Sequence, residues 1–192
     1  MKPYCAPSAF GLKHFRNVKV PNNYTVTKRK TSKHSIKVTK PSRNGFLSPF
    51  RYPGGKRWFI KIARRWLQNT PARPTVLVEP FAGGAGISLA AVHERLVNGA
   101  VFSELDQDIA ATWQSMLNGH ATWLADKVRS FQISRTRVEK KLKRKPRSQH
   151  ERAFQCLLRN RTARGGVIAE GAGLIRRGED GRGLRSRWYA ER

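Results

Sequence analysis

Apolar residues in the middle of the chain recur first at the spacing of a helix and then in a short continuous run. From residue 58 to residue 67 they lie three or four positions apart, which predicts an amphipathic helix that Pro71 and Pro74 end. The predicted stripe consists of Trp58, Ile62, Arg65 and Trp66, widened by Phe59, Ala63 and Leu67. Residues 75–78 then form a β-branched run that is typical of a buried parallel strand.

The alternation of helix and strand patterns continues through the next 40 positions. A glycine-rich stretch at 79–86 precedes an apolar helix pattern at 87–92, which Asn98-Gly99 closes. Residues 100–103 predict a second strand, and Asp106 suits the N-cap of a further helix. That helix is marked by Ile109, Ala110, Trp113 and Leu117. The order of elements predicts the opening of a doubly wound α/β sheet.

Beyond residue 119 the pattern is helical and basic. The spacing of Leu124, Val128 and Phe131 predicts one helix, and the basic segment 135–147 predicts a solvent-facing helix or loop. Residues 149–159 predict another helix, with a core face of Ala153, Cys156, Leu157 and Phe154. After Arg161 the chain is rich in Gly and Arg and has almost no apolar period.

The charge of the chain indicates a polyanionic partner. Lys and Arg number 39 against 12 acids, which gives a net charge of +27. No Asp or Glu occurs in residues 1–78, whereas residues 80–126 contain one basic residue, Arg95. A small-molecule pocket between nucleic-acid-binding flanks explains this distribution, and a structural RNA-binding protein is the alternative that charge alone leaves open. The highly charged residues 1–46 predict a disordered basic arm, either a phosphate-binding arm or a solvated extension.

The remaining composition predicts a cytoplasmic protein. The two cysteines, Cys5 and Cys156, form neither a disulfide framework nor a metal-binding spacing, so we predict no metal site. No apolar run approaches 18 residues, and the N-terminus lacks the apolar stretch of a signal peptide.

The glycine-rich stretch and the acids around it suggest a nucleoside-binding pocket. Glycines let a backbone approach a ligand closely, and Glu104 lies about 20 residues further on, where an acid accepts hydrogen bonds from ribose hydroxyls. Glu79, at the start of the stretch, suits a cationic ligand better than a pyrophosphate. The run Gly83-Gly84-Ala85-Gly86 also departs from the dinucleotide pattern G-x-G-x-x-G. Both details favour S-adenosylmethionine over a dinucleotide, and a purely structural turn is the alternative.

Four segments in order resemble motifs of one enzyme family. They are Pro-Phe-Arg-Tyr-Pro-Gly-Gly-Lys at 49–56, Glu-Pro-Phe-Ala-Gly-Gly-Ala-Gly at 79–86, Ser-Glu-Leu-Asp-Gln-Asp at 103–108 and Leu-Arg-Asn-Arg-Thr at 158–162. Together they resemble the alpha-group DNA adenine methyltransferases, which include the bacterial GATC methylase. The resemblance implies a Rossmann-like methyltransferase sheet, S-adenosylmethionine as cofactor and double-stranded DNA as partner. It implies an S-adenosylmethionine-binding domain at 47–119 and the start of a DNA-recognition region at 120–192.

The resemblance implies roles for individual residues. The implied cofactor site consists of Tyr52, Lys56, Glu79, Phe81, Gly83, Gly86 and Glu104. Lys56 would meet the cofactor carboxylate, Glu79 and the loop would hold the methionine portion, and Glu104 would bind the ribose. A solvated lysine is the alternative for Lys56, and a helix cap alone is the alternative for Asp106.

The same resemblance implies that Arg159, Asn160 and Arg161 meet DNA. An ordinary helix end with an exposed arginine is the alternative. Where the family often has an aromatic residue and Asn-Gly, this chain has Arg164-Gly165-Gly166.

The catalytic motif of the family is missing from the sequence. The family holds the flipped-out adenine with Asp-Pro-Pro-Tyr, and these 192 residues contain no Pro-Pro, so we assign no catalytic residue. We expect a truncated methyltransferase that is inactive alone; a partner chain carrying the catalytic half, or a binding protein that kept the pocket, would also explain the sequence. An incomplete sheet would leave an unpaired edge and an exposed apolar face, and hence poor solubility. The competing functions are a basic nucleic-acid-binding protein without enzymatic activity and an RNA methyltransferase.

Overall fold

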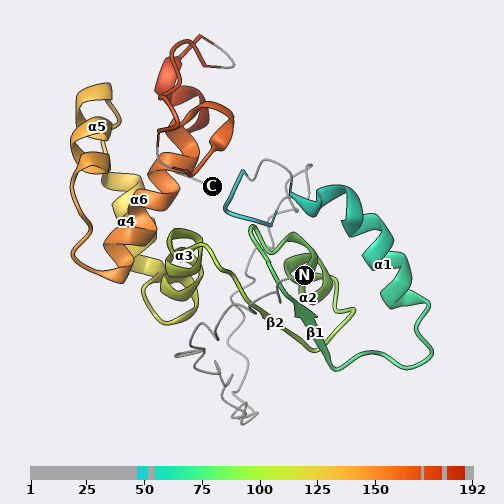
Figure 1. The fold of residues 1–192 in the computed structure, drawn as a ribbon. Coiled ribbons are helices and arrows are strands. Elements are labelled where there is room, and N and C mark those ends of the chain that lie inside the picture. Colours follow the sequence, from blue (N-terminus) through green and yellow to red (C-terminus); the bar gives the residue numbers. More distant parts are fainter. Residues whose placement is uncertain (1–46, 52–54, 170, 179–180, 189–192) are drawn as a thin grey trace, which may run out of the picture. The chain divides into compact units, whose positions relative to one another are not determined.

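The computed structural model describes residues 47–51, 55–169, 171–178 and 181–188. Within them the chain is α/β, with six α-helices and one two-stranded parallel sheet (Figure 1). The predicted arm at 1–46 and the predicted cofactor residue Tyr52 lie outside the described residues. None of the described helices combines the length and the apolar composition needed to cross a membrane.

The sheet consists of two strands joined by one helical crossover. Strand β1 (Val76–Glu79) pairs in parallel with β2 (Gly99–Phe102), so that Val76 lies opposite Gly99 and Glu79 opposite Phe102. Helix α2 (Gly86–His93) connects them, as parallel pairing requires. Helix α1 (Ile60–Gln68), which follows the 3-10 turn η1 (Lys56–Phe59), packs against α2. A small apolar cluster of Leu67, Leu77, Ala91, Leu96 and Val97 joins these helices to the sheet.

One face of the sheet is exposed, which corrects the prediction of a buried strand at 75–78. Val76 and Val78 are 50% and 68% exposed, and their neighbour Val101 on β2 is 51% exposed. These residues point to one face because side chains alternate along a strand. Leu77, on the opposite face, contacts the cluster beside α1 and α2. The described part of the chain therefore covers only one side of the sheet.

The buried stripe of α1 also differs from the predicted one. Trp58, Ile62 and Trp66 are 70%, 51% and 63% exposed, whereas Ala63 and Leu67 are buried. The helix therefore buries the residues that widened the predicted stripe and exposes those at its centre. Periodicity predicted the helix but not the centre of its buried side, because apolar residues occupy much of its circumference.

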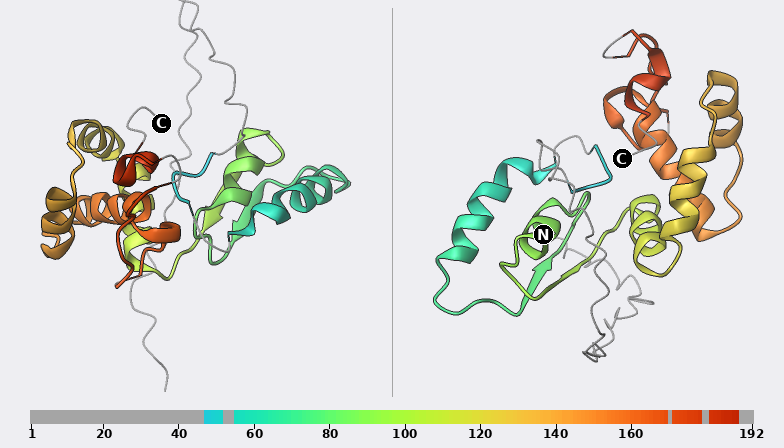
Figure 2. Two further views of the ribbon diagram at one scale, coloured as in Figure 1. Left: turned by 90° about the horizontal axis from the view of Figure 1, so that it is seen from above. Right: turned by 180° about the vertical axis from the view of Figure 1, so that it is seen from behind.

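The remaining helices pack around α6. Helices α3 (Gln107–Leu117), α4 (Ala121–Ser130) and α5 (Arg135–Lys143) all contact α6 (Gln149–Thr162), as Figures 1 and 2 show. Helices α3, α5 and α6 begin at side-chain N-caps, which are Asp106, Ser134 and Ser148. The N-cap predicted for Asp106 is confirmed by bonds from the N–H groups of Asp108 and Ile109.

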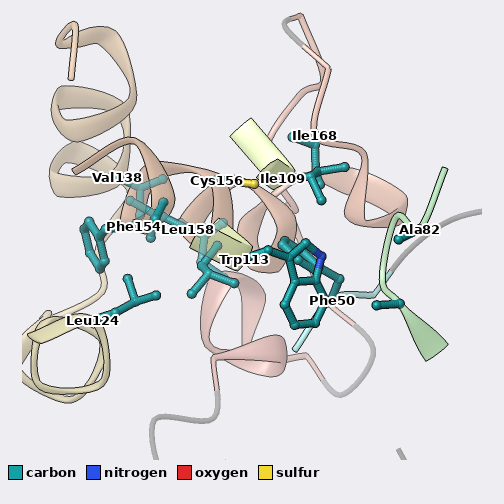
Figure 3. Packing of buried hydrophobic residues seen from close by; sticks show 14 of the residues in the cluster. Phe50, Ala82, Ile109, Trp113, Leu124, Val138, Phe154, Cys156, Leu158 and Ile168 are labelled. Atoms are coloured by element: carbon teal, nitrogen blue, oxygen red, sulfur yellow. The ribbon is translucent and has the colours of Figure 1, made fainter. Parts of the chain in front are cut away.

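A single apolar cluster fills the space between these helices (Figure 3). Its fully buried members include Ile109, Val138, Phe154, Cys156 and Leu158. This confirms the predicted core face of α6. The cluster includes residues on both sides of position 119, where the sequence suggested a change of domain.

The Gly- and Arg-rich segment after α6 adds three separate apolar residues to this cluster. Ile168, Ile175 and Leu184 are buried, although they follow no helical or strand period. The 3-10 turn η2 (Arg164–Gly166) precedes Ile168, and the 3-10 turn η3 (Gly183–Arg187) contains Leu184. The segment is fixed by main-chain bonds, among them Ile175 N to Thr162 O at 2.8 Å.

Burial raises the pKa of the Cys156 thiol to about 12. We therefore expect this thiol to be unreactive in the folded protein, since the thiolate is the reactive form. In a Cys5→Ser variant, alkylation at about pH 8 should proceed at least about a hundredfold more slowly in buffer than in denaturing urea. Equal rates would show that Cys156 is not buried in solution.

Candidate functional site

The carboxylate of Glu79 lies at the end of β1 and is almost completely buried. One of its oxygens, Oε2, accepts hydrogen bonds from the backbone N–H of Ser88 at 2.9 Å and from the Ser88 hydroxyl at 2.6 Å. Ser88 is the third residue of α2, where an N–H has no partner within the helix. Glu79 therefore caps α2, and its charge suits the positive end of the helix dipole. Ser88 itself is a polar residue in an otherwise apolar helix, a signal that the sequence analysis missed.

The second oxygen of Glu79 has no hydrogen-bond partner among the described residues. This atom, Oε1, is buried and lies 3.8 Å from Nζ of Lys56, which is beyond hydrogen-bonding distance. Nζ instead donates to the carbonyl oxygen of Phe81 at 2.7 Å. A buried carboxylate oxygen without a donor is costly, so this position would gain from a ligand that donates a hydrogen bond.

Glu104 connects the end of β2 with the glycine-rich loop that follows β1. Its Oε2 accepts a hydrogen bond from the N–H of Gly83 at 2.5 Å, and its Oε1 accepts one from Asp106 at 2.9 Å. The side chain is only half-buried. Because each carboxylate oxygen carries two lone pairs, both oxygens retain one for a ligand.

Three residues of the loop have left-handed backbones. Phe81, Gly83 and Ala85 have φ angles of 57°, 53° and 48°. Such angles are uncommon for residues with a Cβ, and they cluster where a backbone is shaped around a ligand or a close contact. The side chain of Phe81 is 73% exposed, so only its carbonyl faces Lys56.

One further glycine of the loop serves internal packing. A Cβ at Gly84 would lie 2.7 Å from the hydroxyl of Ser48, so the absence of a side chain at position 84 makes room for Ser48. At Gly86, a predicted cofactor residue, a Cβ would lie 3.4 Å from Cδ1 of Ile60, which is an ordinary van der Waals distance. Packing therefore requires glycine at position 84 and not at position 86.

Trp113 anchors the loop from the helical side. Its indole N–H donates to the carbonyl of Gly83 at 2.8 Å. Its ring meets that of Phe50 edge-on at a centroid distance of 5.7 Å (Figure 3). It meets the ring of Phe102 edge-on at 5.3 Å. Through Trp113, α3 thus contacts both the loop and the segment that precedes η1. From its spacing in the sequence, Trp113 was predicted only as a residue of the helix.

Asn160 is fully buried, and the DNA contact expected for it stays a prediction. Its Oδ1 accepts from the N–H of Arg51 at 3.0 Å, and its Nδ2 donates to the carbonyls of Arg51 at 2.8 Å and Gly166 at 2.9 Å. All of its groups are occupied by main chain. In this arrangement Asn160 joins two of the motif segments, 49–56 and 158–162.

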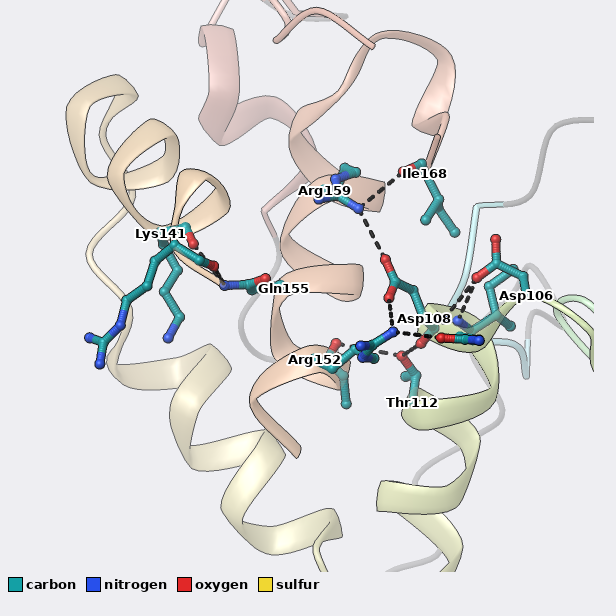
Figure 4. A network of polar contacts seen from close by, with 12 residues as sticks. Asp106, Asp108, Thr112, Lys141, Arg152, Gln155, Arg159 and Ile168 are labelled. Atoms are coloured by element: carbon teal, nitrogen blue, oxygen red, sulfur yellow. Dashed lines mark hydrogen bonds and ion pairs between the residues drawn. The ribbon is translucent and has the colours of Figure 1, made fainter. Parts of the chain in front are cut away.

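The arginines beside Asn160 make internal contacts as well. Arg161 donates to the carbonyl of Pro49 at 2.7 Å. Arg159 is largely buried, with its guanidinium 3.1 Å from Oδ2 of Asp108 and 3.3 Å from the carbonyl of Ile168 (Figure 4). The observed contacts of Arg159 and Arg161 hold the chain together, and the DNA contacts expected for them stay predictions.

Asp108 is the centre of a polar network between α3 and α6. It pairs with Arg159 through Oδ2 and with Arg152 through Oδ1 at 3.4 Å (Figure 4). Thr112, one turn later on α3, donates to the Asp108 carbonyl at 2.8 Å. This network aligns α3, and with it Trp113, against α6.

The described surface has two hollows away from the glycine-rich loop. One, of about 470 Å³, lies between α3 and the start of α6 and includes Gln114, Arg147 and Arg152. The other, of about 320 Å³, includes Ile133, Arg135 and Arg185. Neither includes Lys56, Glu79 or Glu104.

No family model and no curated protein matches the chain.

Proposed function

We propose that this chain is the cofactor-binding portion of an S-adenosylmethionine-dependent DNA adenine methyltransferase. Its two parallel strands and their crossover helix would then be the first unit of a doubly wound, Rossmann-like sheet. The four motif segments support the proposal, because three of them converge on one loop. Residues 49–56 contribute Lys56, residues 79–86 form the loop, and residues 103–108 contribute Glu104. The fourth, at 158–162, holds the first in place.

The observation that carries the proposal is that Oε1 of Glu79 accepts no hydrogen bond from any described residue and lies beside Lys56. A zwitterionic amino acid needs a negative group for its ammonium and a positive group for its carboxylate, and these two side chains lie 3.8 Å apart at the loop. The methionine ammonium can donate the hydrogen bond that Oε1 of Glu79 lacks. Lys56 can give its remaining N–H groups to the carboxylate.

Glu104 would orient the nucleoside portion. Its Oε2 bonds the loop at Gly83 and its Oε1 bonds Asp106, and the second lone pair of each oxygen could accept a hydrogen bond from a ribose hydroxyl. Bound S-adenosylmethionine would supply an electrophilic methyl group on a sulfonium centre. The chain's own residues bind and orient the two ends of that molecule.

Holding the adenine amine needs residues that this sequence does not contain, since it has no Asp-Pro-Pro-Tyr motif. We therefore propose that the 192 residues bind the cofactor and do not transfer its methyl group by themselves. Residues that carry that motif, in the same protein or in a second polypeptide, would complete the reaction.

Calorimetric titration with S-adenosylmethionine, run beside transfer of tritiated methyl to duplex DNA, tests the proposal. We expect saturable one-site binding without transfer. Transfer by the chain alone would show that the catalytic residues are misassigned. Absence of binding by the folded protein would overturn the cofactor assignment.

Substituting Glu104 with alanine should weaken cofactor binding by about 1–3 kcal/mol, because the ribose would lose a charged acceptor. The exposed Asp126→Ala variant is a matched control that removes the same charge from α4. We expect the control to bind like the wild type. An unchanged dissociation constant for Glu104→Ala would exclude the ribose role.

One observation favours a second function, that of a nucleic-acid-binding protein without cofactor. Oε2 of Glu79 and both oxygens of Glu104 already accept hydrogen bonds from the chain itself. Under this second function the two acids would serve only to fix the loop. The calorimetric titration distinguishes the two functions directly.

A further inference from the structure

Helix α5 and the turn after it carry a dense basic segment. Residues 135–147 contain eight Lys or Arg residues and one acid, Glu139. The cations are Arg135, Arg137, Lys140, Lys141, Lys143, Arg144, Lys145 and Arg147. The structure separates those that serve the fold from those that do not.

Two acids near this segment, Glu139 and Glu151, make three contacts with it. Glu139 pairs with Arg135 at 3.5 Å, one turn away on α5. Glu151 of α6 pairs with Lys141 at 3.5 Å and accepts the N–H of Arg147 at 2.8 Å. This backbone hydrogen bond, with the nearby cations, lowers the pKa of Glu151. Glu151 therefore stabilises the turn between α5 and α6, whereas the contact of Glu139 stays within α5.

Five cations of the segment remain exposed and have no ion pair with any described residue. They are Lys140, Lys143, Arg144, Lys145 and Arg147, which we call the α5 corner. Val138 and Leu142 face the core, which turns Lys140 to the outer side of the helix. The α5 corner is thus a surface of like charges held together by the fold.

The backbone of the α5 corner is fixed. The amide of Gln155 donates to the carbonyls of Lys141 at 2.8 Å and Arg144 at 2.6 Å, which closes the end of α5 (Figure 4). Ser148 caps α6 directly after the turn. Like charges on a fixed backbone repel each other, and a polyanion relieves that repulsion without a cost for ordering the backbone.

We propose that the α5 corner is a docking surface for the phosphate backbone of duplex DNA. Residues 135–147 contain no aromatic side chain on which single-stranded bases could stack. Both apolar residues of α5, Val138 and Leu142, pack inward, so the helix offers no apolar face to a membrane. Binding to the backbone of a duplex needs neither aromatic side chains nor an apolar face. The Lys and Arg residues of the α5 corner can contact its phosphates without recognising the base sequence. The choice of DNA rests on the proposed function.

The test is anisotropy of a short fluorescein-labelled DNA duplex over a series of salt concentrations, with the full chain. The variant Lys140→Gln/Lys143→Gln/Lys145→Gln removes three charges that contact no described residue. Each lost phosphate contact lowers the slope of log affinity against log salt by about 0.9, so we expect a slope smaller by about 2–3. At about 0.1 M salt the affinity should fall at least about tenfold.

Two matched variants make the test specific. Lys61→Gln/Arg65→Gln/Arg95→Gln removes the same charge from exposed positions around α1 and α2, and should change the slope less than half as much. Lys140→Arg/Lys143→Arg/Lys145→Arg keeps the charge and should bind like the wild type. Equal losses in both glutamine variants would overturn the proposal, because binding would then follow net charge alone. Stronger binding of the wild type to a single strand or to anionic vesicles than to the duplex would overturn it too.

Cofactor titration of the same variants separates this proposal from the proposed function. If the wild type binds S-adenosylmethionine and the two glutamine variants lose DNA affinity equally, only the proposal of a docking surface is overturned. If the wild type does not bind the cofactor but DNA affinity falls in the α5-corner variant alone, the proposed function is overturned and the docking surface is supported.

Discussion

Replacing Trp113 with alanine is expected to destabilise the folded state by about 3–5 kcal/mol, the usual cost of truncating a buried tryptophan. The ring is 6% exposed and lies between Phe50, Phe102 and the carbonyl of Gly83. Its removal would leave a cavity and a carbonyl without its donor. Because small domains are stable by about 5–15 kcal/mol, the loss should be obvious in urea denaturation followed by circular dichroism.

Trp66 provides the matched control, since it is the same residue type at 63% exposure on α1. We expect Trp66→Ala to change the free energy of unfolding by less than about 0.5 kcal/mol. A conservative variant, Trp113→Phe, keeps most of the apolar volume and removes only the donor to Gly83. Comparable losses in Trp113→Ala and Trp66→Ala would contradict the anchoring role of Trp113.

The second large effect is expected for Asn160→Ala. This change removes three hydrogen bonds and leaves the N–H and carbonyl of Arg51 and the carbonyl of Gly166 without their partner. Each unsatisfied buried group costs about 1–3 kcal/mol, with partial relief from water, so we expect a total near 3 kcal/mol. Urea denaturation measures this loss as well.

The exposed Asn118, which follows α3, is the control for this substitution. Asn118→Ala should have almost no effect on the free energy of unfolding. We call the three hydrogen bonds of Asn160 to Arg51 and Gly166 the clamp. If Asn160→Ala leaves the free energy of unfolding unchanged but weakens DNA binding, the DNA contact predicted from the sequence is right and the clamp is wrong. A loss of stability with unchanged DNA affinity would confirm the clamp.

The sequence predicted the kinds of elements well because local spacing determines them. The helices at α3, α4 and α6 and the N-cap at Asp106 follow from side-chain periodicity and from one short polar residue. The buried side of α1 did not follow, since apolar residues flank it on both sides. What covers a helix or a strand depends on distant parts of the chain, and no local pattern contains that information.

The candidate site shows the same division. The glycine-rich loop and the acid that ends each strand were recognisable from their order and spacing, and the structure brings Glu104 to Gly83. The internal contacts of Asn160 and Arg161 could not be recognised in this way, because the partners of these residues lie 109 and 112 positions away along the chain. A motif resemblance indicates which residues matter and leaves open what they touch.

The clamp between Asn160 and Arg51 also constrains the order of events during synthesis. The segment at 49–51 is synthesised more than a hundred residues before its partners on α6. Strands β1 and β2 with α2 can pair early, since their contacts are local, but Lys56 follows closely on a segment that still lacks its partners on α6. The loop should therefore reach its final geometry only after α6 has folded. A chaperone or a ligand that acts on nascent chains would meet the loop while it is still open.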